Sequence, residues 1–128
     1  MPAAVGCSLG LGRAPVICLI GDGAALYSPQ ALWTAAHEKL PVTFVVMNNR
    51  EYNVLKNFMR SQGDYNSAKT NRFIAMDLDH PAIDYIALAN SMGVSARRVE
   101  RAADIAPSIE AAISSGSTNL VEVLISAS

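Results

Sequence analysis

The chain has 128 residues, of which 51% are apolar, and its formal net charge is −1 at pH 7. This length fits one domain with a core of its own, and the balanced charge excludes the basic footprint of a nucleic-acid-binding protein. No apolar run reaches membrane-spanning length and no basic leader begins the chain, so we expect a soluble, cytoplasmic protein. Cys7 and Cys18 lie in apolar runs, and we expect both to be buried, reduced thiols.

The first half of the chain predicts a helix, a strand, a second helix and a second strand. Residues 3–11 are small and apolar with helical spacing. Residues 16–20 are apolar throughout, which predicts a strand buried on both faces of a parallel sheet. Ser28, followed by proline, fits the N-cap of a helix over residues 30–38, and the apolar run 42–47 predicts the next buried strand. Strand, helix and strand form one βαβ unit.

The second half predicts three helices and two strands, separated by polar breaks. The helices cover residues 52–60, 85–92 and 105–114, and the strands lie near 96–99 and over 120–125. Residues 61–82 are polar and irregular and predict a long loop. Asp84 and Asp104 occupy the N-cap positions of the last two helices.

This alternation predicts an α/β fold, a three-layer sandwich in which a mostly parallel sheet carries helices on both faces, as a single domain over residues 1–128. In such sheets ligands bind beyond the carboxyl ends of the strands. Two polar motifs stand at such ends: Gly21-Asp22-Gly23 after the first strand and Asn48-Asn49 after the second. If these strands are close in the sheet, Asp22 and Asn49 converge on one crevice.

The two side chains in this crevice offer a carboxylate and an amide oxygen, hard donors that suit Mg²⁺ or Ca²⁺ rather than zinc. Two protein ligands are too few for a closed cage, but Mg²⁺ commonly completes its octahedron with water and substrate phosphate. A phosphorylated ligand is therefore implied. The flanking glycines let the backbone turn sharply, and the N–H groups of Gly23, Ala24 and Ala25 can face phosphate oxygens.

Each motif also has an ordinary structural explanation. A lone Gly-Asp-Gly is usually a turn, and two asparagines after a strand usually begin a loop. Their pairing at the ends of successive strands is much less expected by chance, and this pairing favours a ligand site.

The segment GDGAALYSPQALWTAAHEKLPVTFVVMNN (21–49) resembles the thiamine diphosphate motif, which begins GDG and ends NN. It is similar to the benzoylformate decarboxylase branch of the thiamine diphosphate-dependent enzymes. The similarity extends over nearly the whole chain and is weakest across 61–80. It includes MPAAVG (1–6), EYNVLKNF (51–58), IDYIALANSMGV (83–94) and LVEVLIS (120–126). The resemblance implies the diphosphate-binding domain that stands last in this family's chain order.

The resemblance also implies roles at the matching positions. Mg²⁺ would be bound by the side chains of Asp22 and Asn49 and by the main-chain carbonyl of Glu51. The cofactor-binding residues would be Gly21, Asp22, Gly23, Ala24, Ala25, Asn49 and Tyr52. Val54 and Phe58 would line the substrate pocket, with core packing as the alternative. Relatives often carry Gly-Thr where this chain has Arg50-Glu51, a change that main-chain ligation tolerates.

The other parts of such an enzyme have no match in this sequence. In the resembled family a separate pyrimidine-binding domain supplies the activating glutamate from a partner subunit. No catalytic residue is predicted, and His37 and His80 are interpreted as non-catalytic. We expect a C-terminal fragment or a separate subunit of a 2-oxo acid decarboxylase, inactive alone, that forms a homo-oligomer and meets a pyrimidine-binding partner.

Two other functions remain open. The chain could be part of a carboligase similar to acetolactate synthase or benzaldehyde lyase. It could also be a non-catalytic α/β interaction module, flavodoxin-like in topology, in which Asp22 is a turn residue and the metal site is vestigial. Calorimetry with Mg²⁺ and thiamine diphosphate separates binding from non-binding alternatives.

Overall fold

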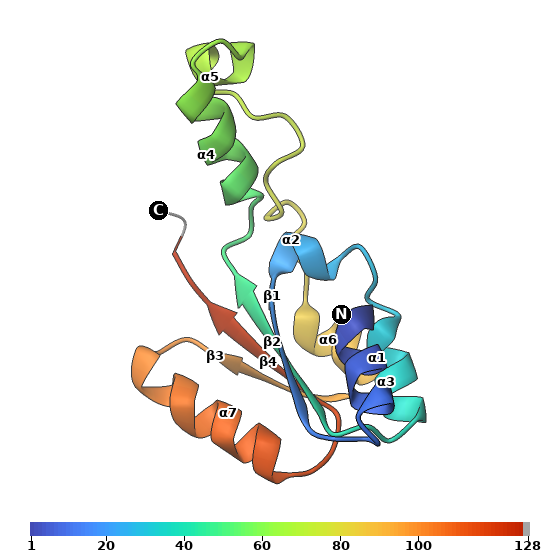
Figure 1. Cartoon of the computed structure of the whole chain (residues 1–128). Coiled ribbons are helices and arrows are strands. Elements are labelled where there is room, and N and C mark those ends of the chain that lie inside the picture. Colours follow the sequence, from blue (N-terminus) through green and yellow to red (C-terminus); the bar gives the residue numbers. More distant parts are fainter. Residues whose placement is uncertain (127–128) are drawn as a thin grey trace.

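The computed structural model describes residues 1–126 and has an α/β fold (Figure 1). Its strands are β1 (Val16–Gly21), β2 (Val42–Asn48), β3 (Ser95–Val99) and β4 (Asn119–Leu124). Its helices are α1 (Pro2–Gly10), α2 (Asp22–Ala25), α3 (Ala31–His37), α4 (Asn53–Gln62), α5 (Asn66–Thr70), α6 (Tyr85–Ser91) and α7 (Ile105–Ser114), with a 3₁₀ turn η1 (Ala102–Asp104) before α7. Within residues 1–126 no helix combines the length and apolarity needed to cross a membrane.

The four described strands form one sheet in the order β1-β2-β4-β3, and every neighbouring pair is parallel. β1 and β2 are direct neighbours, with Gly21 opposite Met47 at their carboxyl ends. Parallel pairing brings all carboxyl ends to one edge of the sheet. The parallel α/β sheet that the sequence predicts is therefore confirmed.

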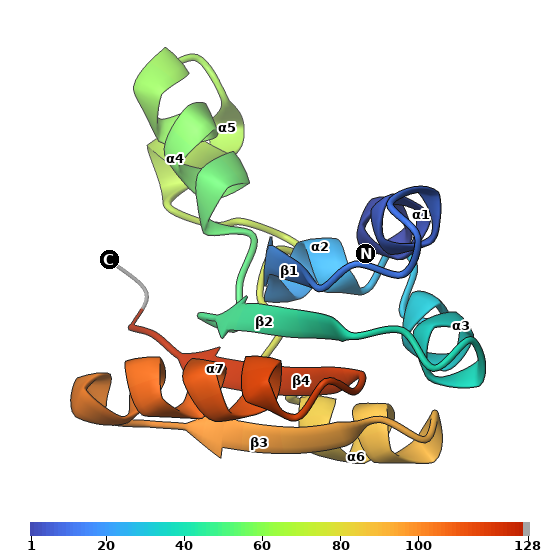
Figure 2. The same ribbon diagram turned by 60° about the horizontal axis from the view of Figure 1, so that its bottom comes forward.

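The helices form layers on the two faces of this sheet, with α1, α3 and α6 on one side and α7 on the other (Figures 1 and 2). On the first face Leu32, Phe44 and Tyr85 are buried in one apolar cluster. On the second face Val45 and Val121 pack beneath α7 in a separate cluster. The three-layer sandwich is confirmed, and the two clusters are held apart by the sheet itself.

β1 differs from the prediction of a strand buried on both faces. Its burial alternates, and the side chains of Ile17 and Leu19 are 55% and 71% exposed. The reason is that α7 covers β4 and β2 but does not reach β1, which pairs on one side only within the described sheet. The prediction of buried thiols is wrong for Cys7, which is exposed on α1, whereas Cys18 faces the first cluster and is partly buried.

The helix ends confirm one of three predicted caps. The carboxylate of Asp84 accepts hydrogen bonds from the N–H groups of Ile86 and Ala87, at 3.0 and 3.1 Å. Ser28 does not cap α3, because that helix begins three residues later and its N-cap has no side-chain bond. Asp104 stands at the N-cap of α7 but makes no capping bond, since its backbone is already helical where η1 runs into α7.

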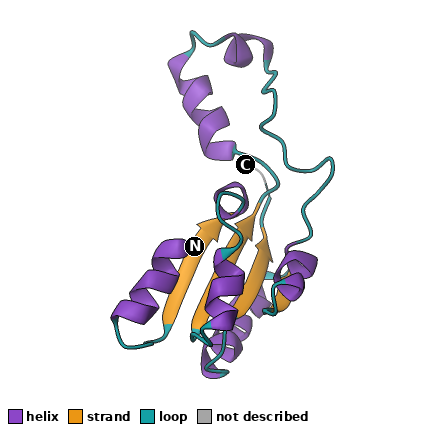
Figure 3. Ribbon diagram, turned by 90° about the vertical axis from the view of Figure 1, so that its right-hand side faces the viewer, coloured by secondary structure: helices purple, strands orange, loops and turns teal. Residues whose placement is uncertain are grey.

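Residues 53–82 form an arm that stands beyond the carboxyl ends of the strands (Figure 3). The arm contains α4 and also α5, a short helix inside the segment predicted to be an irregular loop. Two backbone hydrogen bonds close its base: the N–H of Tyr52 donates to the carbonyl of Met76, and that of Leu78 donates to the carbonyl of Arg50. The arm thus leaves and rejoins the sheet next to the residues that follow β2.

Candidate functional site

The candidate site lies where β1 and β2 end, and it is a cavity of about 390 Å³ at the base of the arm. Because the two strands are neighbours in parallel register, the residues that follow them come together there. Most of the residues predicted from the sequence line the cavity, namely Gly21, Asp22, Gly23, Ala24, Asn49, Glu51, Tyr52 and Val54. The convergence of the two motifs on one crevice is therefore found in the structure.

Asp22, the first residue of α2, is a buried carboxylate at the bottom of this site. Its side chain is only 4% exposed, and its Oδ2 accepts a hydrogen bond from the N–H of Arg50 at 2.8 Å. Burial raises the pKa of Asp22; the N–H groups of Gly23 and Arg50 lower it in part, and the nearby charge of Glu51 raises it further. Within residues 1–126 no cationic side chain forms an ion pair with Asp22. A bound cation would therefore offset the cost of burying this charge.

The two asparagines after β2 have different environments. Asn49 is half-buried and lines the cavity, where its Oδ1 accepts the N–H of Glu51 at 3.2 Å. Asn48 is 4% exposed and points into the interior, where its Nδ2 donates to Glu122 at 2.6 Å. Of these two asparagines, Asn49 is thus the one placed to offer its amide oxygen to a ligand in the cavity.

Glu51 also lines the cavity, but its carboxylate is engaged elsewhere. It is in a salt bridge with the ammonium of Lys56, which also pairs with Asp77. The antiparallel contact between residues 51 and 77 uses the N–H of Tyr52 and the carbonyl of Arg50, and it leaves the Glu51 carbonyl unused. A main-chain contribution from Glu51 is therefore compatible with the structure.

The structure gives Gly23 a steric reason to be small, but it gives Gly21 none, because no described atom lies within 4 Å of a Cβ built there. Gly21 has an extended backbone, and neither glycine adopts the left-handed conformation of a sharp turn. A Cβ built on Gly23 would lie 2.4 Å from Cε1 of Tyr52, so the tyrosine ring packs directly on this glycine. The neighbour that requires a glycine at position 23 is therefore the Tyr52 ring, and the close approach of this backbone to a ligand stays a prediction.

Two of the predicted site residues do not line the cavity. Ala25 ends α2 with its side chain in the core, at 2% exposed. Phe58 lies one turn further along α4 than Val54 and is 54% exposed, outside the cavity lining. Both histidines also lie elsewhere: His37 stacks on Trp33, and His80 pairs with Asp79 in the arm.

The oxygen donors of this cavity suit Mg²⁺, but they are too few to bind a metal ion without other ligands. They comprise a carboxylate, an amide oxygen and a carbonyl, all hard oxygen donors. In residues 1–126 no group of three or more His, Cys, Asp or Glu side chains is placed to hold a metal ion. A cation at Asp22 would therefore need further oxygens from a phosphorylated ligand or from water.

Other residues at the site were missed from the sequence. Met47, Leu55 and Ile125 add apolar lining to the cavity. Glu122 does not line the cavity but accepts a hydrogen bond from Asn48, the neighbour of the lining residue Asn49. Its only signal in the sequence was a charged residue inside the apolar strand LVEVLI. Nothing in the sequence marked Lys56, whose partners are brought to it by the folding of the arm.

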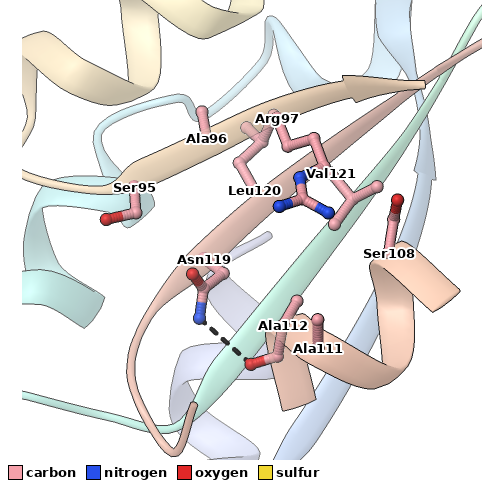
Figure 4. A pocket seen from close by; sticks show the side chains of 9 residues that line it. All are labelled: Ser95, Ala96, Arg97, Ser108, Ala111, Ala112, Asn119, Leu120 and Val121. Carbon is pink, nitrogen blue, oxygen red and sulfur yellow. Dashed lines mark hydrogen bonds between the residues drawn. The ribbon is translucent and has the colours of Figure 1, made fainter. Parts of the chain in front are cut away.

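A second hollow of about 180 Å³ lies between β3, β4 and α7, towards the amino ends of the strands (Figure 4). Arg97 is its only charged lining residue and is exposed. Asn119 donates within this region to the carbonyl of Ala112. The hollow has no carboxylate and lies away from the strand ends, so it is not the site that the two motifs form.

A parallel α/β sheet with hard oxygen donors at the carboxyl ends of neighbouring strands defines a domain that binds a phosphorylated cofactor. The family model described as "Thiamine pyrophosphate enzyme, C-terminal TPP binding domain" matches residues 1–123. The chain belongs to this family, as its C-terminal domain that binds thiamine pyrophosphate, also called thiamine diphosphate.

Individual relatives agree with this family. The chain is 32% identical over 123 residues to benzoylformate decarboxylase of Pseudomonas aeruginosa, covering 96% of this chain and 22% of that protein. It is 34% identical over 125 residues to IlvX of Mycobacterium tuberculosis, whose name places it with the acetolactate synthase large subunits, covering 98% and 24%. The structure of a 4-hydroxybenzoylformate decarboxylase of Rhodococcus jostii matches with a TM-score of 0.87 and 34% identity, covering all of this chain and 23% of that one. The chain thus spans less than a quarter of the length of these relatives.

Proposed function

We propose that this chain holds the diphosphate of thiamine diphosphate through Mg²⁺, as part of a 2-oxo acid decarboxylase of the benzoylformate type. One observation carries the proposal: the buried carboxylate of Asp22 has no cationic partner within residues 1–126 and faces a cavity that also contains Asn49. A divalent cation with phosphate oxygens would complete this arrangement. The cofactor, when bound, supplies the stabilisation of a carbanion.

Each residue of the cavity has a defined task in this proposal. Asp22, Asn49 and the carbonyl of Glu51 bind Mg²⁺. The backbone of Gly23 and Ala24, at the start of α2, contacts the diphosphate, and Tyr52 closes that side because its ring packs on Gly23.

The arm supplies the apolar side of the same cavity. Val54 lines the substrate pocket together with Leu55. Phe58 belongs to the same apolar side of α4 and extends it away from the cavity. These side chains exclude water from an apolar substituent of the substrate. None of them has a titratable group, so none can act as a general acid or base.

The proposal includes a partner. A pyrimidine-binding domain or subunit would supply the activating glutamate and complete the cofactor site. The length of the relatives supports this, since the chain spans less than a quarter of each. We propose that the chain alone is inactive and that the working enzyme is a cytoplasmic homo-oligomer.

A carboligase of the acetolactate synthase type is the second candidate, favoured by the similarity to IlvX. The two candidates differ in product. With benzoylformate the first releases carbon dioxide and an aldehyde, whereas the second joins two molecules of a 2-oxo acid such as pyruvate with loss of carbon dioxide. Product analysis of the protein in its natural length and assembly decides between them.

Calorimetry tests the metal and cofactor assignment on the same protein. We expect thiamine diphosphate to bind only with Mg²⁺, and Asp22→Ala to weaken that binding by at least tenfold because a metal ligand is lost. Asp104→Ala is the matched control, since this exposed aspartate makes no capping bond and does not line the cavity. Binding without Mg²⁺, or equal binding by wild type and Asp22→Ala, contradicts the proposal.

A further inference from the structure

Glu122 is an unusual residue for its place in the fold. It lies in the middle of β4 between the apolar Val121 and Val123, and its side chain is fully buried. Burying a carboxylate is costly, and an apolar residue of similar volume would often serve stability as well or better. A charge retained at this position therefore needs a task other than packing.

Both oxygens of the Glu122 carboxylate are engaged. Oε1 accepts the Nδ2 group of Asn48 at 2.6 Å, and Oε2 accepts Nε of Arg98 at 2.7 Å. The register explains these contacts: Glu122 pairs with Val46 on β2 and with Arg98 on β3, and Asn48 is two residues further along β2 on the same face. The carboxylate thus reaches from the centre of the sheet to the end of β2.

This contact determines how the amide of Asn48 is oriented. A carboxylate only accepts hydrogen bonds, so the NH₂ group of Asn48 has to face Glu122 and its oxygen has to face the other way. That oxygen accepts the N–H of Arg50 at 3.0 Å. The same N–H donates to Oδ2 of Asp22 at 2.8 Å. Glu122 is therefore two hydrogen bonds away from the N–H group that contacts the Asp22 carboxylate.

Residue 50 needs such support. Its φ of 59° is in the left-handed region, which costs a residue with a side chain roughly 1 kcal/mol. The hydrogen bonds of its N–H to Asn48 and Asp22 hold this conformation, and it turns the chain so that Asn49 and Glu51 line the cavity.

A second series of contacts joins Glu122 to the main chain of Asp22. Arg98 also lies 3.6 Å from the carboxylate of Asp84, which caps α6. The next residue, Tyr85, is buried and donates its hydroxyl to the carbonyl of Asp22 at 2.7 Å. The Arg50 N–H thus contacts the side chain of Asp22 and the Tyr85 hydroxyl contacts its main chain, and both groups are connected to Glu122 through intermediate residues.

We propose that Glu122 is a positioning residue of the cofactor site: through Asn48 it holds the N–H of Arg50, and so sets residues 48–51 beside Asp22. The proposal rests on the proposed function for its effect on cofactor binding. It assigns Glu122 no contact with the cofactor.

Amide hydrogen exchange tests the structural step without any ligand. Glu122→Met keeps the volume of the side chain and removes both acceptors, and Arg98, whose side chain is 39% exposed, can turn to water. We expect the N–H of Arg50 to exchange about fivefold to tenfold faster in this variant. The reason is that the variant loses the hydrogen bond to Glu122 that orients Asn48, the acceptor of this N–H. Val121→Ala is the control, because it removes apolar volume at the neighbouring residue on the opposite face of the sheet. When the two variants are compared at equal free energy of unfolding, Val121→Ala should leave the exchange rate of the Arg50 N–H near that of the wild type. An unchanged Arg50 rate in Glu122→Met overturns the proposal.

Cofactor affinity tests the functional step in the protein in its natural assembly. We expect Glu122→Met to weaken Mg²⁺-dependent binding of thiamine diphosphate by about tenfold, the usual effect of removing a group that orients a metal ligand. Asn48→Ala should do the same, and the double variant should be no weaker than Asn48→Ala alone because both act through one chain of contacts. Additive losses, or an equal loss in Val121→Ala, show an effect of stability alone and overturn the proposal.

The two tests separate this inference from the proposed function. If the wild type binds no thiamine diphosphate with Mg²⁺, the proposed function and the effect of Glu122 on binding are both wrong, while the exchange rate still shows whether Glu122 holds the Arg50 N–H. If the wild type binds and Glu122→Met binds equally well, only the inference about Glu122 is wrong.

Discussion

The body of this molecule, which is the sheet with α1, α3, α6 and α7, and the arm of residues 53–82 are held together by different forces. In the body, large apolar side chains such as Leu32, Phe44 and Val121 are at most 1% exposed. In the arm, Val54 and Ile74 are 82% and 83% exposed. Hydrophobic burial therefore stabilises the body, and it contributes little to the arm.

Polar and aromatic contacts hold the arm instead. Lys56 is buried at its base, where it pairs with Glu51 and Asp77. Further out, the rings of Phe58 and Tyr65 meet at 6.5 Å. Segments with few buried apolar contacts open locally at low free-energy cost. The candidate site combines the two regions, because its oxygen donors follow strands of the body and part of its apolar lining comes from the arm.

The largest effect should come from a matched pair of phenylalanine substitutions, one in each region. Phe44→Ala removes a fully buried ring from β2 and should lower the free energy of unfolding by about 3–5 kcal/mol. Phe58→Ala removes a ring that is 54% exposed and should cost less than about 1 kcal/mol. Urea denaturation measures both. Equal losses would show that the arm has a packed core of its own.

Lys56→Met should open the arm without unfolding the body. It leaves the carboxylates of Glu51 and Asp77 close together with no cation between them. We expect a local loss of about 2 kcal/mol, below the cost of breaking a fully buried pair because the Asp77 side chain is 59% exposed. Faster amide exchange at residues 76–78, with an unchanged urea midpoint, is the expected result. Arg13→Met, which breaks an exposed pair with Glu38, is the control and should leave the arm unchanged.

Arg50→Gly tests the strain at the point where the body meets the arm. The left-handed backbone of Arg50 suits glycine, so the substitution should raise the free energy of unfolding by about 1 kcal/mol. Arg60→Gly, inside α4, should have the opposite sign and cost about 1 kcal/mol of helix stability. Thermal denaturation and exchange in α4 measure the two variants. Destabilisation by Arg50→Gly would mean that the arginine side chain contributes more than its backbone costs.

The smallest effect concerns the charge of Asp22, whose pKa is raised by burial above its ordinary value of 3.8. Between the ordinary pKa and the raised pKa, the folded chain binds more protons than the unfolded chain. The free energy of unfolding therefore falls as the pH rises, and this loss is complete above the raised pKa. Asp22→Asn keeps an acceptor for the Arg50 N–H and removes the charge. Without Mg²⁺ it should therefore be more stable than wild type at neutral pH, and the difference should vanish below pH 3.8.

The effect of Asp22→Asn should be small because the N–H groups of Gly23 and Arg50 already offset part of the burial cost. Urea denaturation from about pH 3 to about pH 7 measures it. A variant less stable than wild type at neutral pH would show that those N–H groups outweigh the burial. Added Mg²⁺ and thiamine diphosphate should stabilise the wild type and not the variant.

Local patterns in the sequence were enough to predict the parallel α/β fold, most helix and strand positions and the convergence of Asp22 with Asn49. These features depend on periodicity and on strand order, and a strand end is visible as the residue at which an apolar run stops. The cap at Asp84 was predictable for the same reason, because capping is a contact between near neighbours in the chain.

Only the tertiary structure decided which faces are covered, how the arm is closed and what supports the site. The exposure of Ile17 and Leu19 depends on where α7 lies, and the burial of Lys56 depends on Asp77, which is brought to it by the arm. Glu122 meets Asn48 across a sequence distance of 74 residues. Contacts of this kind are set by packing between distant segments, and no local pattern of residue types records them.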